Sequence, residues 1–187
     1  MNRYMRAAIY FPTGFLKVCV NKLFHGNHFR CHTLCGLSPL SEITVDRGGS
    51  LFAGKNFRMR DGAKLRIRKG AQCIIGNDVC LNSQNIITCR ERIIIGNGVM
   101  LSPNVQIYDH DHDFRAQLGN YITTPIEIGD HCWIGANTVI LRGTKLGSHC
   151  VVGAGSVLKG TYPAGSMIIQ KRNTLISEVR ENGRECS

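Results

Sequence analysis

Large aromatic side chains are scarce in this sequence. Only 7% of its 187 residues are Phe, Trp or Tyr, with a single Trp, whereas Gly occurs 21 times. A core built from few aromatic residues is aliphatic, and frequent glycines divide the chain by turns. We therefore expect many short strands rather than a few large helices, in one domain long enough to bury a sizeable core.

Paired cysteines and a membrane-spanning run are also missing. The nine cysteines are scattered without tight pairing, which favours a reducing compartment over a disulfide framework. The N-terminal stretch MNRYMRAAIYFPTGFLKVCV contains Pro12 and Lys17 and lacks a small-residue cleavage site, so it is not typical of a secretory signal. No stretch is long and apolar enough to cross a bilayer. We expect a cytoplasmic protein.

Acidic residues are rare in the N-terminal part. Residues 1–72 hold 13 Lys and Arg against 3 Asp and Glu, whereas residues 73–187 hold 10 of each, so the net charge of +10 lies entirely in the first part. This favours attraction to phosphates, anionic lipid headgroups or an acidic glycan, although solvated strand edges explain it equally well. Nucleic acid is disfavoured, because no aromatic-rich or helical reading motif accompanies the charge.

A six-residue repeat dominates the second half of the chain. From Ile128 the sequence reads IGDHCW, IGANTV, ILRGTK, LGSHCV, VGAGSV and LKGTYP, and each hexapeptide opens with an aliphatic residue. The fifth place is Cys, Thr or Ser in the first five of them. The same aliphatic openings occur earlier in three sets of three: Ala53, Met59, Leu65, Ile75, Leu81, Ile87, Ile95, Leu101 and Ile107.

This period predicts an all-β fold, a parallel β-helix in which each strand stacks on the strand one coil earlier. Equivalent openings from residue 53 to residue 146 lie 22, 20, 33 and 18 residues apart, so one protruding loop of about 109–125 is inserted. We expect an N-terminal extension over 1–40 that packs on the β-helix, the β-helix over 41–165, and a helical C-terminal tail over 166–187.

Two pairs of residues follow from the same count. Cys132 and Cys150 lie eighteen residues apart and should stack as small inward-facing side chains without a redox role. His131 and His149 should share one solvent-facing corner on adjacent coils. The repeat alone therefore explains both pairs.

The stretch VQIYDHDHDF lies at the mouth of the inserted loop. In an extended strand, His110 and His112 face one way, and Asp109, Asp111 and Asp113 face the other. Neutral imidazole is a natural general base near neutral pH. From these residues alone the stretch is a metal site, a catalytic base or a polar loop.

Several motifs together resemble the hexapeptide-repeat acetyltransferases, in particular the galactoside and maltose O-acetyltransferases and those of capsule and O-antigen assembly. They are the Ile-Gly hexapeptides, LSPNVQIYDHDH, HCWIGAN with Trp133, and VVGAGSVLKG, and the resemblance covers roughly residues 40 to 165. It implies a left-handed β-helix, a homotrimer, and acetyl-CoA as co-substrate in the cleft between subunits. It also implies direct acetylation of a sugar hydroxyl in glycan or polysaccharide synthesis.

The resemblance assigns roles to the acceptor side of the site. In the family a Pro-Asn-Val strand leads to the catalytic base at its tenth residue, which is His112 here. Asn82 in CLNSQN matches an asparagine that holds the acceptor hydroxyl, with His110 and Asp109 as further acceptor-binding neighbours. One of the aspartates, or a backbone carbonyl, would fix the imidazole tautomer.

The resemblance also assigns the acetyl-CoA side. Trp133 matches the tryptophan that lines the cofactor tunnel, and Ala136 and Ala154 match small corners beside the pantetheine arm. The C-terminal MIIQKRNTLISEVRENG departs from the family, which closes with a proline turn and a basic residue near the nucleotide phosphates. We therefore expect phosphate contacts from three other basic residues: Lys159, Lys171 and Arg172.

Other functions remain open at this level. N-acetylation of an amino sugar uses nearly the same chemistry. A zinc enzyme of the β-helix carbonic anhydrase type would use a His-x-His pair, but the further His-x4-His pair is absent, so we expect no metal. A non-catalytic trimer that binds a partner, for example a membrane surface, through its basic N-terminal half is the third alternative.

Overall fold

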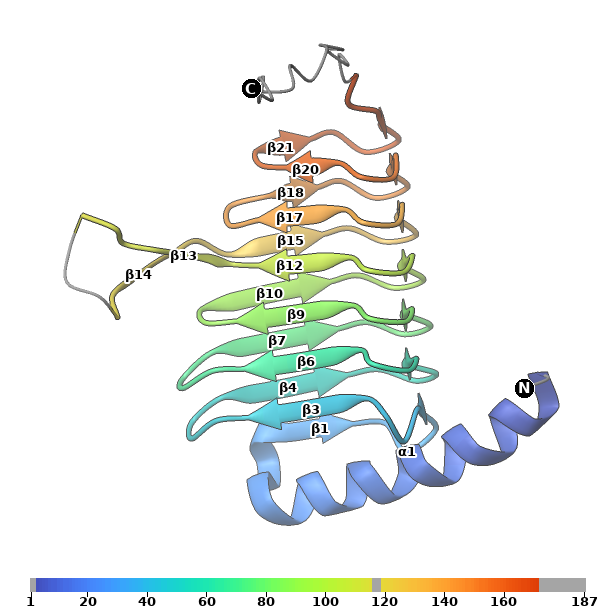
Figure 1. Cartoon of the computed structure of the whole chain (residues 1–187). Coiled ribbons are helices and arrows are strands. Elements are labelled where there is room, and N and C mark those ends of the chain that lie inside the picture. The colour runs from blue at the N-terminus through green and yellow to red at the C-terminus, as the bar shows by residue number, and fades with distance from the viewer. Residues whose placement is uncertain (1–2, 116–118, 172–187) are drawn as a thin grey trace, which may run out of the picture.

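Three parallel β-sheets form a β-helix that makes up most of the molecule (Figure 1). The computed structural model describes residues 3–115 and 119–171. Two sheets have seven strands and the third has six, and consecutive coil strands belong to different sheets, so each full coil gives one strand to each sheet. The predicted parallel β-helix is confirmed.

The strands of each sheet follow the coil from its N-terminal to its C-terminal end. The first sheet consists of β1 (Phe29–Cys31), β4 (Ser50–Ala53), β7 (Gln72–Ile75), β10 (Arg92–Ile95), β15 (Ile126–Ile128), β18 (Lys145–Leu146) and β21 (Thr161–Tyr162). The second consists of β2 (Gly36–Leu37), β5 (Arg58–Met59), β8 (Cys80–Leu81), β11 (Met100–Leu101), β16 (Trp133–Ile134), β19 (Val151–Val152) and β22 (Met167–Ile168). The third consists of β3 (Glu42–Val45), β6 (Lys64–Ile67), β9 (Ile86–Cys89), β12 (Gln106–Tyr108), β17 (Val139–Leu141) and β20 (Val157–Leu158).

The aliphatic openings of the hexapeptides form ladders inside the coil. In the first sheet the paired residues are Ala53, Ile75, Ile95, Ile128 and Leu146, each aligned with the next. These residues are all buried, and their spacing reproduces the intervals of 22, 20, 33 and 18 residues. The six-residue period therefore predicted both the inward face and the strand register correctly.

The small fifth-place residues are also buried. Cys132 is 1% exposed and Cys150 is fully buried, and burial raises the pKa of the Cys132 thiol. His131 and His149 adopt left-handed backbone conformations, with φ of 56° and 61°, and their exposed rings stack with centroids 5.2 Å apart. Both expected pairs are confirmed.

The coil extends beyond the expected range of 41–165. Strands β1 and β2 complete the first coil, and β22 adds a strand within the expected tail. Helix α1 (Arg3–His25) and the short 3-10 helix η1 (Gly26–His28) precede the coil, and α1 lies across its N-terminal end (Figure 1). Within the described part of the chain, no helix is long and apolar enough to cross a membrane. The tail predicted to be helical over 166–187 contains strand β22 instead in its described part, and residues 172–187 lie outside the described residues.

The inserted loop leaves the coil between β12 and β15. It begins as an antiparallel pair of strands, β13 (His110–His112) and β14 (Tyr121–Thr123), which projects sideways from the coil (Figure 1). His110 pairs with Thr123, and His112 pairs with Tyr121. The loop predicted over 109–125 is therefore a hairpin that carries both histidines.

Candidate active site

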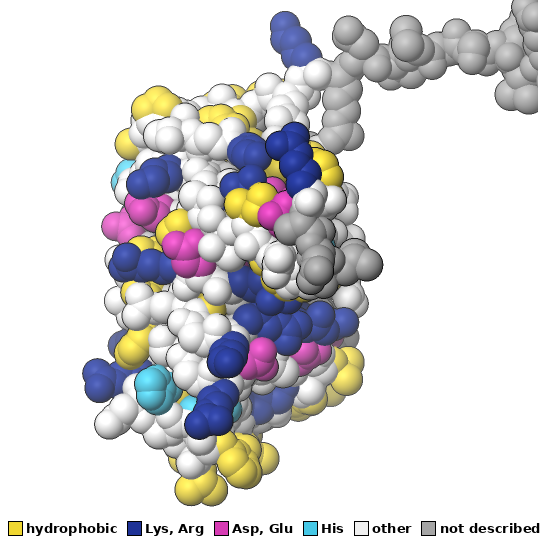
Figure 2. Space-filling view, turned by 90° about the vertical axis from the view of Figure 1, so that its left-hand side faces the viewer, with side chains coloured by type: hydrophobic (Ala, Val, Ile, Leu, Met, Phe, Trp, Pro, Cys, Tyr) yellow, Lys and Arg dark blue, Asp and Glu magenta, His cyan; other side chains and the backbone are white. Residues whose placement is uncertain are grey.

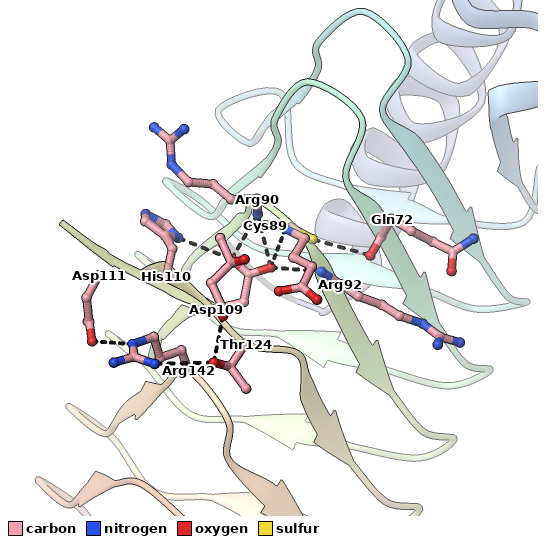
Figure 3. A network of polar contacts seen from close by, with 11 residues as sticks. Gln72, Cys89, Arg90, Arg92, Asp109, His110, Asp111, Thr124 and Arg142 are labelled. Carbon is pink, nitrogen blue, oxygen red and sulfur yellow. Dashed lines mark hydrogen bonds and ion pairs between the residues drawn. The ribbon is translucent and has the colours of Figure 1, made fainter. Parts of the chain in front are cut away.

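Asp109 is the buried anchor of the inserted hairpin. Its side chain is fully buried, and its carboxylate oxygens accept hydrogen bonds from the backbone N–H groups of Arg90, Glu91 and Arg92 at 2.8–3.0 Å. Arg90 and Glu91 form the tight corner between β9 and β10, one coil earlier, and Arg92 begins β10. Figure 3 shows the carboxylate held between this corner and His110. The carboxylate of Asp109 is therefore surrounded by groups of the protein itself.

His110 is oriented by that buried carboxylate. Its Nδ1 lies 3.1 Å from Oδ1 of Asp109, and its side chain is only 13% exposed. The ring packs edge-on against Tyr108 and Tyr121, with centroid distances of 5.9 and 5.5 Å. Burial lowers the pKa of His110, and the hydrogen bond that the imidazole donates to Asp109 opposes this effect without cancelling it. The carboxylate thus orients an imidazole that burial favours in its neutral form.

His112 lies two residues further out and is exposed to solvent. Its ring centroid is 4.6 Å from that of Tyr121, so both histidines pack on the same tyrosine. The guanidinium of Arg90 lies 3.4 Å from the centroid of this tyrosine ring. The expected strand alternation is confirmed for the two histidines, and their shared neighbour Tyr121 carried no signal in the sequence that we recognised.

The opposite side of the hairpin is tied to the next coil. Arg142 donates from Nε to Oδ2 of Asp111 at 2.6 Å and from a terminal nitrogen to Oγ1 of Thr124 at 3.2 Å. The backbone N–H of Thr124 donates to the carbonyl oxygen of Asp109 at 2.9 Å. Both ends of the hairpin are therefore fixed to the rigid coil, as Figure 3 shows. The roles of Arg90 and Arg142 were not predicted from the sequence.

A second group of expected residues lies on another corner of the coil. Asn82 follows β8, Trp133 begins β16, and Ala136 and Ala154 follow β16 and β19, where the chain turns from the second sheet into the third. Trp133 is 51% exposed and donates from Nε1 to Oγ of Ser102 at 3.1 Å. The Ala136 carbonyl accepts a hydrogen bond from the N–H of Gly155 at 2.7 Å, so these small corners stack on each other.

The structure does not bring the two groups together within one chain. Along each coil, the histidines come after the strand of the third sheet, and Asn82 and Trp133 come before it. Strand β9 (Ile86–Cys89) separates these corners and alone spans about 13 Å at roughly 3.3 Å per residue. Along the coil axis the two groups nevertheless lie close in height, because Asn82, His112 and Trp133 occupy three successive coils with His112 in the middle one.

The expected phosphate contacts lie near the C-terminal end of the coil. Lys159 and Lys171 are exposed there, and Arg172 falls outside the described residues. In the part of the chain that the structure describes, no group of three or more His, Cys, Asp or Glu side chains is arranged to hold a metal ion.

The chain matches known hexapeptide-repeat proteins. Residues 125–160 match the family described as bacterial transferase hexapeptide (six repeats). Nodulation protein L of Rhizobium leguminosarum bv. viciae is 46% identical over 95 residues, which cover 49% of this chain and 50% of that protein. WbbJ of Escherichia coli (strain K12), whose name assigns it to lipopolysaccharide biosynthesis as an O-acetyl transferase, is 27% identical over 136 residues, or 66% of this chain and 69% of WbbJ.

The fold has a counterpart among solved structures. The crystal structure of a hexapeptide-repeat acetyltransferase from Vibrio cholerae matches with a TM-score of 0.54 at 22% identity, over 84% of this chain and 82% of that one. The chain is thus similar to hexapeptide-repeat proteins in sequence and in fold, and its resemblance to the hexapeptide-repeat acetyltransferases is confirmed. The chain spans about half or less of the length of the curated relatives that it matches first.

Proposed function

We propose that this protein transfers the acetyl group of acetyl-CoA to a sugar hydroxyl of a glycan, polysaccharide or sugar precursor, in the cytoplasm. The observation that carries the proposal is the inserted hairpin. It holds His110 and His112 on a rigid anchor, at a coil height between those of Asn82 and Trp133. Relatives named for nodulation and for O-acetyl transfer in lipopolysaccharide biosynthesis support a glycan acceptor.

The separation of the two corners supports a homotrimer with its sites between subunits. One chain keeps the histidine hairpin and the Asn82 and Trp133 corner apart by the width of the third sheet. When similar coils pack side by side around a threefold axis, the hairpin of one subunit can reach the other corner of its neighbour. Each site would then be complete only in the assembly.

In this proposal His112 is the general base. Its exposed imidazole takes the proton of the acceptor hydroxyl, whose oxygen attacks the thioester carbon. The tetrahedral intermediate collapses, the bond from carbon to sulfur breaks, and the imidazolium returns the proton to the leaving CoA thiolate. Asn82 would hold the acceptor hydroxyl. Asp109, being buried, would act through His110, which flanks the acceptor.

The corner with Trp133 fits acetyl-CoA as co-substrate. Its half-exposed indole offers a flat apolar wall, and the stacked Ala136 and Ala154 turns leave room for a narrow pantetheine chain beside backbone N–H and C=O groups. Lys159 and Lys171 remain our assignments for the phosphates, together with Arg172. Acetyl-CoA supplies the activated thioester, and the protein needs no metal for this reaction.

Release of CoA from acetyl-CoA in the presence of individual sugars, nucleotide sugars and amino sugars tests the proposal. We expect turnover with a hydroxyl acceptor, and a loss of about 100-fold to 10,000-fold in His112→Ala, the range typical of a removed general base. Acetyl-CoA should raise the melting temperature of wild type and of His112→Ala equally, because the base does not bind the co-substrate. Trp133→Ala should reduce that shift.

Four results would contradict parts of the proposal. Equal turnover in His112→Ala and wild type rules out His112 as the base, and a loss confined to His110→Ala moves that role to His110. Turnover only with amino sugars would establish N-acetylation instead. Sedimentation velocity of the full chain tests the trimer, and a monomer with full activity would exclude sites between subunits.

A further inference from the structure

Helix α1 (Arg3–His25) packs on the coil with an unusually polar face. Tyr10 donates to Oδ1 of Asp61 at 2.6 Å, and the Nζ of Lys17 donates to the carbonyl oxygens of Ser38 and Ser41 at 2.8 and 2.5 Å. Burial lowers the pKa of Lys17. Gly14 allows the close approach, because a Cβ there would overlap the carbonyl oxygen of Cys35. Beside the fully buried Val18, polar and small residues thus take much of the side of the helix that faces the coil.

The outward face of α1 is apolar instead. Its large hydrophobic side chains are exposed by 41–82% of their area: Tyr4, Met5, Ile9, Phe11, Phe15, Leu16, Val20, Leu23 and Phe24. The helix runs along and beyond the N-terminal end of the coil (Figure 1), and hydrophobic side chains gather at that end in the space-filling view (Figure 2). A continuous exposed apolar face of this size marks a binding surface, since water is a poor solvent for it.

The charged residues of α1 itself are all basic, and Asp61 of the coil meets the helix through Tyr10. The first acidic residue of the whole sequence is Glu42. A pocket of about 470 Å³ opens beside the helix, and its lining includes the guanidinium groups of Arg6, Arg58 and Arg60 next to Phe11. The Nε of Arg58 is buried and has no hydrogen-bond partner within the described residues. Three guanidinium groups at a pocket suit phosphate oxygens.

We propose that α1 lies on an anionic membrane surface, with its apolar face in the headgroup boundary and the arginine pocket against lipid phosphates. An apolar helix face flanked by basic residues is the arrangement that binds such interfaces. A second copy of the chain fits less well, because contact between two such faces brings Arg6 and Lys22 of both copies together, and α1 itself has no acidic residue to offset them. Anionic lipid complements both the apolar face and the charge.

Sedimentation of the full chain with lipid vesicles tests this surface. Vesicles of phosphatidylcholine alone are compared with vesicles containing phosphatidylglycerol. We expect the anionic vesicles to bind at least about tenfold more protein at low salt, because each nearby basic residue strengthens attraction to an anionic leaflet. Binding should fall as salt screens the charges. Equal binding to both vesicles, or binding to neither, would overturn the proposal.

Surface variants then locate the contact. Leu16→Asp combined with Leu23→Asp should reduce binding to anionic vesicles by roughly tenfold or more, since both side chains are exposed and neither makes the inward contacts of α1. Met167→Asp is the matched control, because Met167 is 72% exposed at the other end of the coil, and it should bind as wild type does. Arg60→Gln should weaken binding less.

Two further results would refute the assignment. If the Leu16 and Leu23 double variant binds like wild type, α1 is not the contact. If that variant lowers the oligomeric state in sedimentation velocity, the face belongs to another copy of the chain. Circular dichroism confirms that each variant is folded. The vesicle assay needs neither acetyl-CoA nor an acceptor, so its outcome is independent of the proposed function.

Discussion

The two pairs of histidines differ in what holds them. His131 and His149 lie on regular corners of the coil, where the repeat itself places them one above the other at 5.2 Å. His110 and His112 lie on an insert that interrupts the repeat, and His110 is held by a buried carboxylate. The first pair is explained by the architecture. The second pair requires an anchor that the repeat does not supply. For this reason we assign the acetyl-transfer chemistry to His110 and His112.

The two aspartates that flank His110 also differ in their surroundings. Asp109 is fully buried and accepts from three successive backbone N–H groups, whereas Asp111 is part-exposed and pairs with Arg142 at 2.6 Å. The two residues alternate in the same sequence motif. Because their burial differs, we expect removal of the charge to lower the free energy of unfolding by different amounts.

Asp109→Asn should have the largest effect on stability. The amide keeps one acceptor oxygen but turns an N–H donor toward backbone N–H groups that are themselves donors, and a buried polar mismatch of this kind costs about 2–4 kcal/mol. Urea denaturation of the full chain at fixed protein concentration measures the change. Asp111→Asn is the control and should cost less than about 1 kcal/mol, because its pair with Arg142 is solvated. Equal costs for the two variants would contradict the anchor role.

The sequence predicted the coil well because its determinants are local. An aliphatic residue every sixth position fixes which side chains face inward, and the intervals between openings fix the register. Strand alternation likewise predicted that His110 and His112 share a face. Side chains on the regular strands of the coil can therefore be assigned to a face from spacing alone.

The same spacing could not predict the burial of Asp109. Four residues separate β6 from β7, but only Arg90 and Glu91 separate β9 from β10, and this tighter corner leaves N–H groups that need an acceptor. The interval between equivalent aliphatic openings falls from 22 to 20 residues here, and this shortening reflects the tighter corner. Helix α1 shows a second limit. An amphipathic pattern does not say which face turns inward, and here Tyr10 and Lys17 do so while Leu16 and Leu23 do not.

His110→Asn should change the pH dependence of stability. Burial lowers the pKa of His110, the hydrogen bond to Asp109 acts against this effect, and the charges of Arg90 and His112 lower the pKa further. Below the ordinary pKa of about 6.5, the unfolded chain therefore binds a proton that the folded chain does not, so stability falls as pH falls. Asn retains a donor toward Asp109 but does not titrate.

The measurement is the free energy of unfolding between about pH 7 and pH 5, in wild type and variant. The decline toward acid pH should be shallower in His110→Asn. Thr123→Ser changes the strand partner of His110 without removing the imidazole and should decline as wild type does. An identical slope in His110→Asn and wild type would show that His110 is as easily protonated in the folded protein as in the unfolded chain.

The smallest effect is expected at the regular corner. His131→Asn should change the free energy of unfolding by less than about 0.5 kcal/mol, since Asn56, Asn104 and Asn137 already occupy other corners with the same left-handed φ of 57°. Acetyl transfer should be unchanged. His131→Val should cost about 1–2 kcal/mol, because a β-branched residue is strained at positive φ. A loss of transfer in His131→Asn would place this corner in the active site and remove the contrast between the two pairs. A loss of stability confined to the valine variant shows that this corner requires the backbone conformation and not the imidazole.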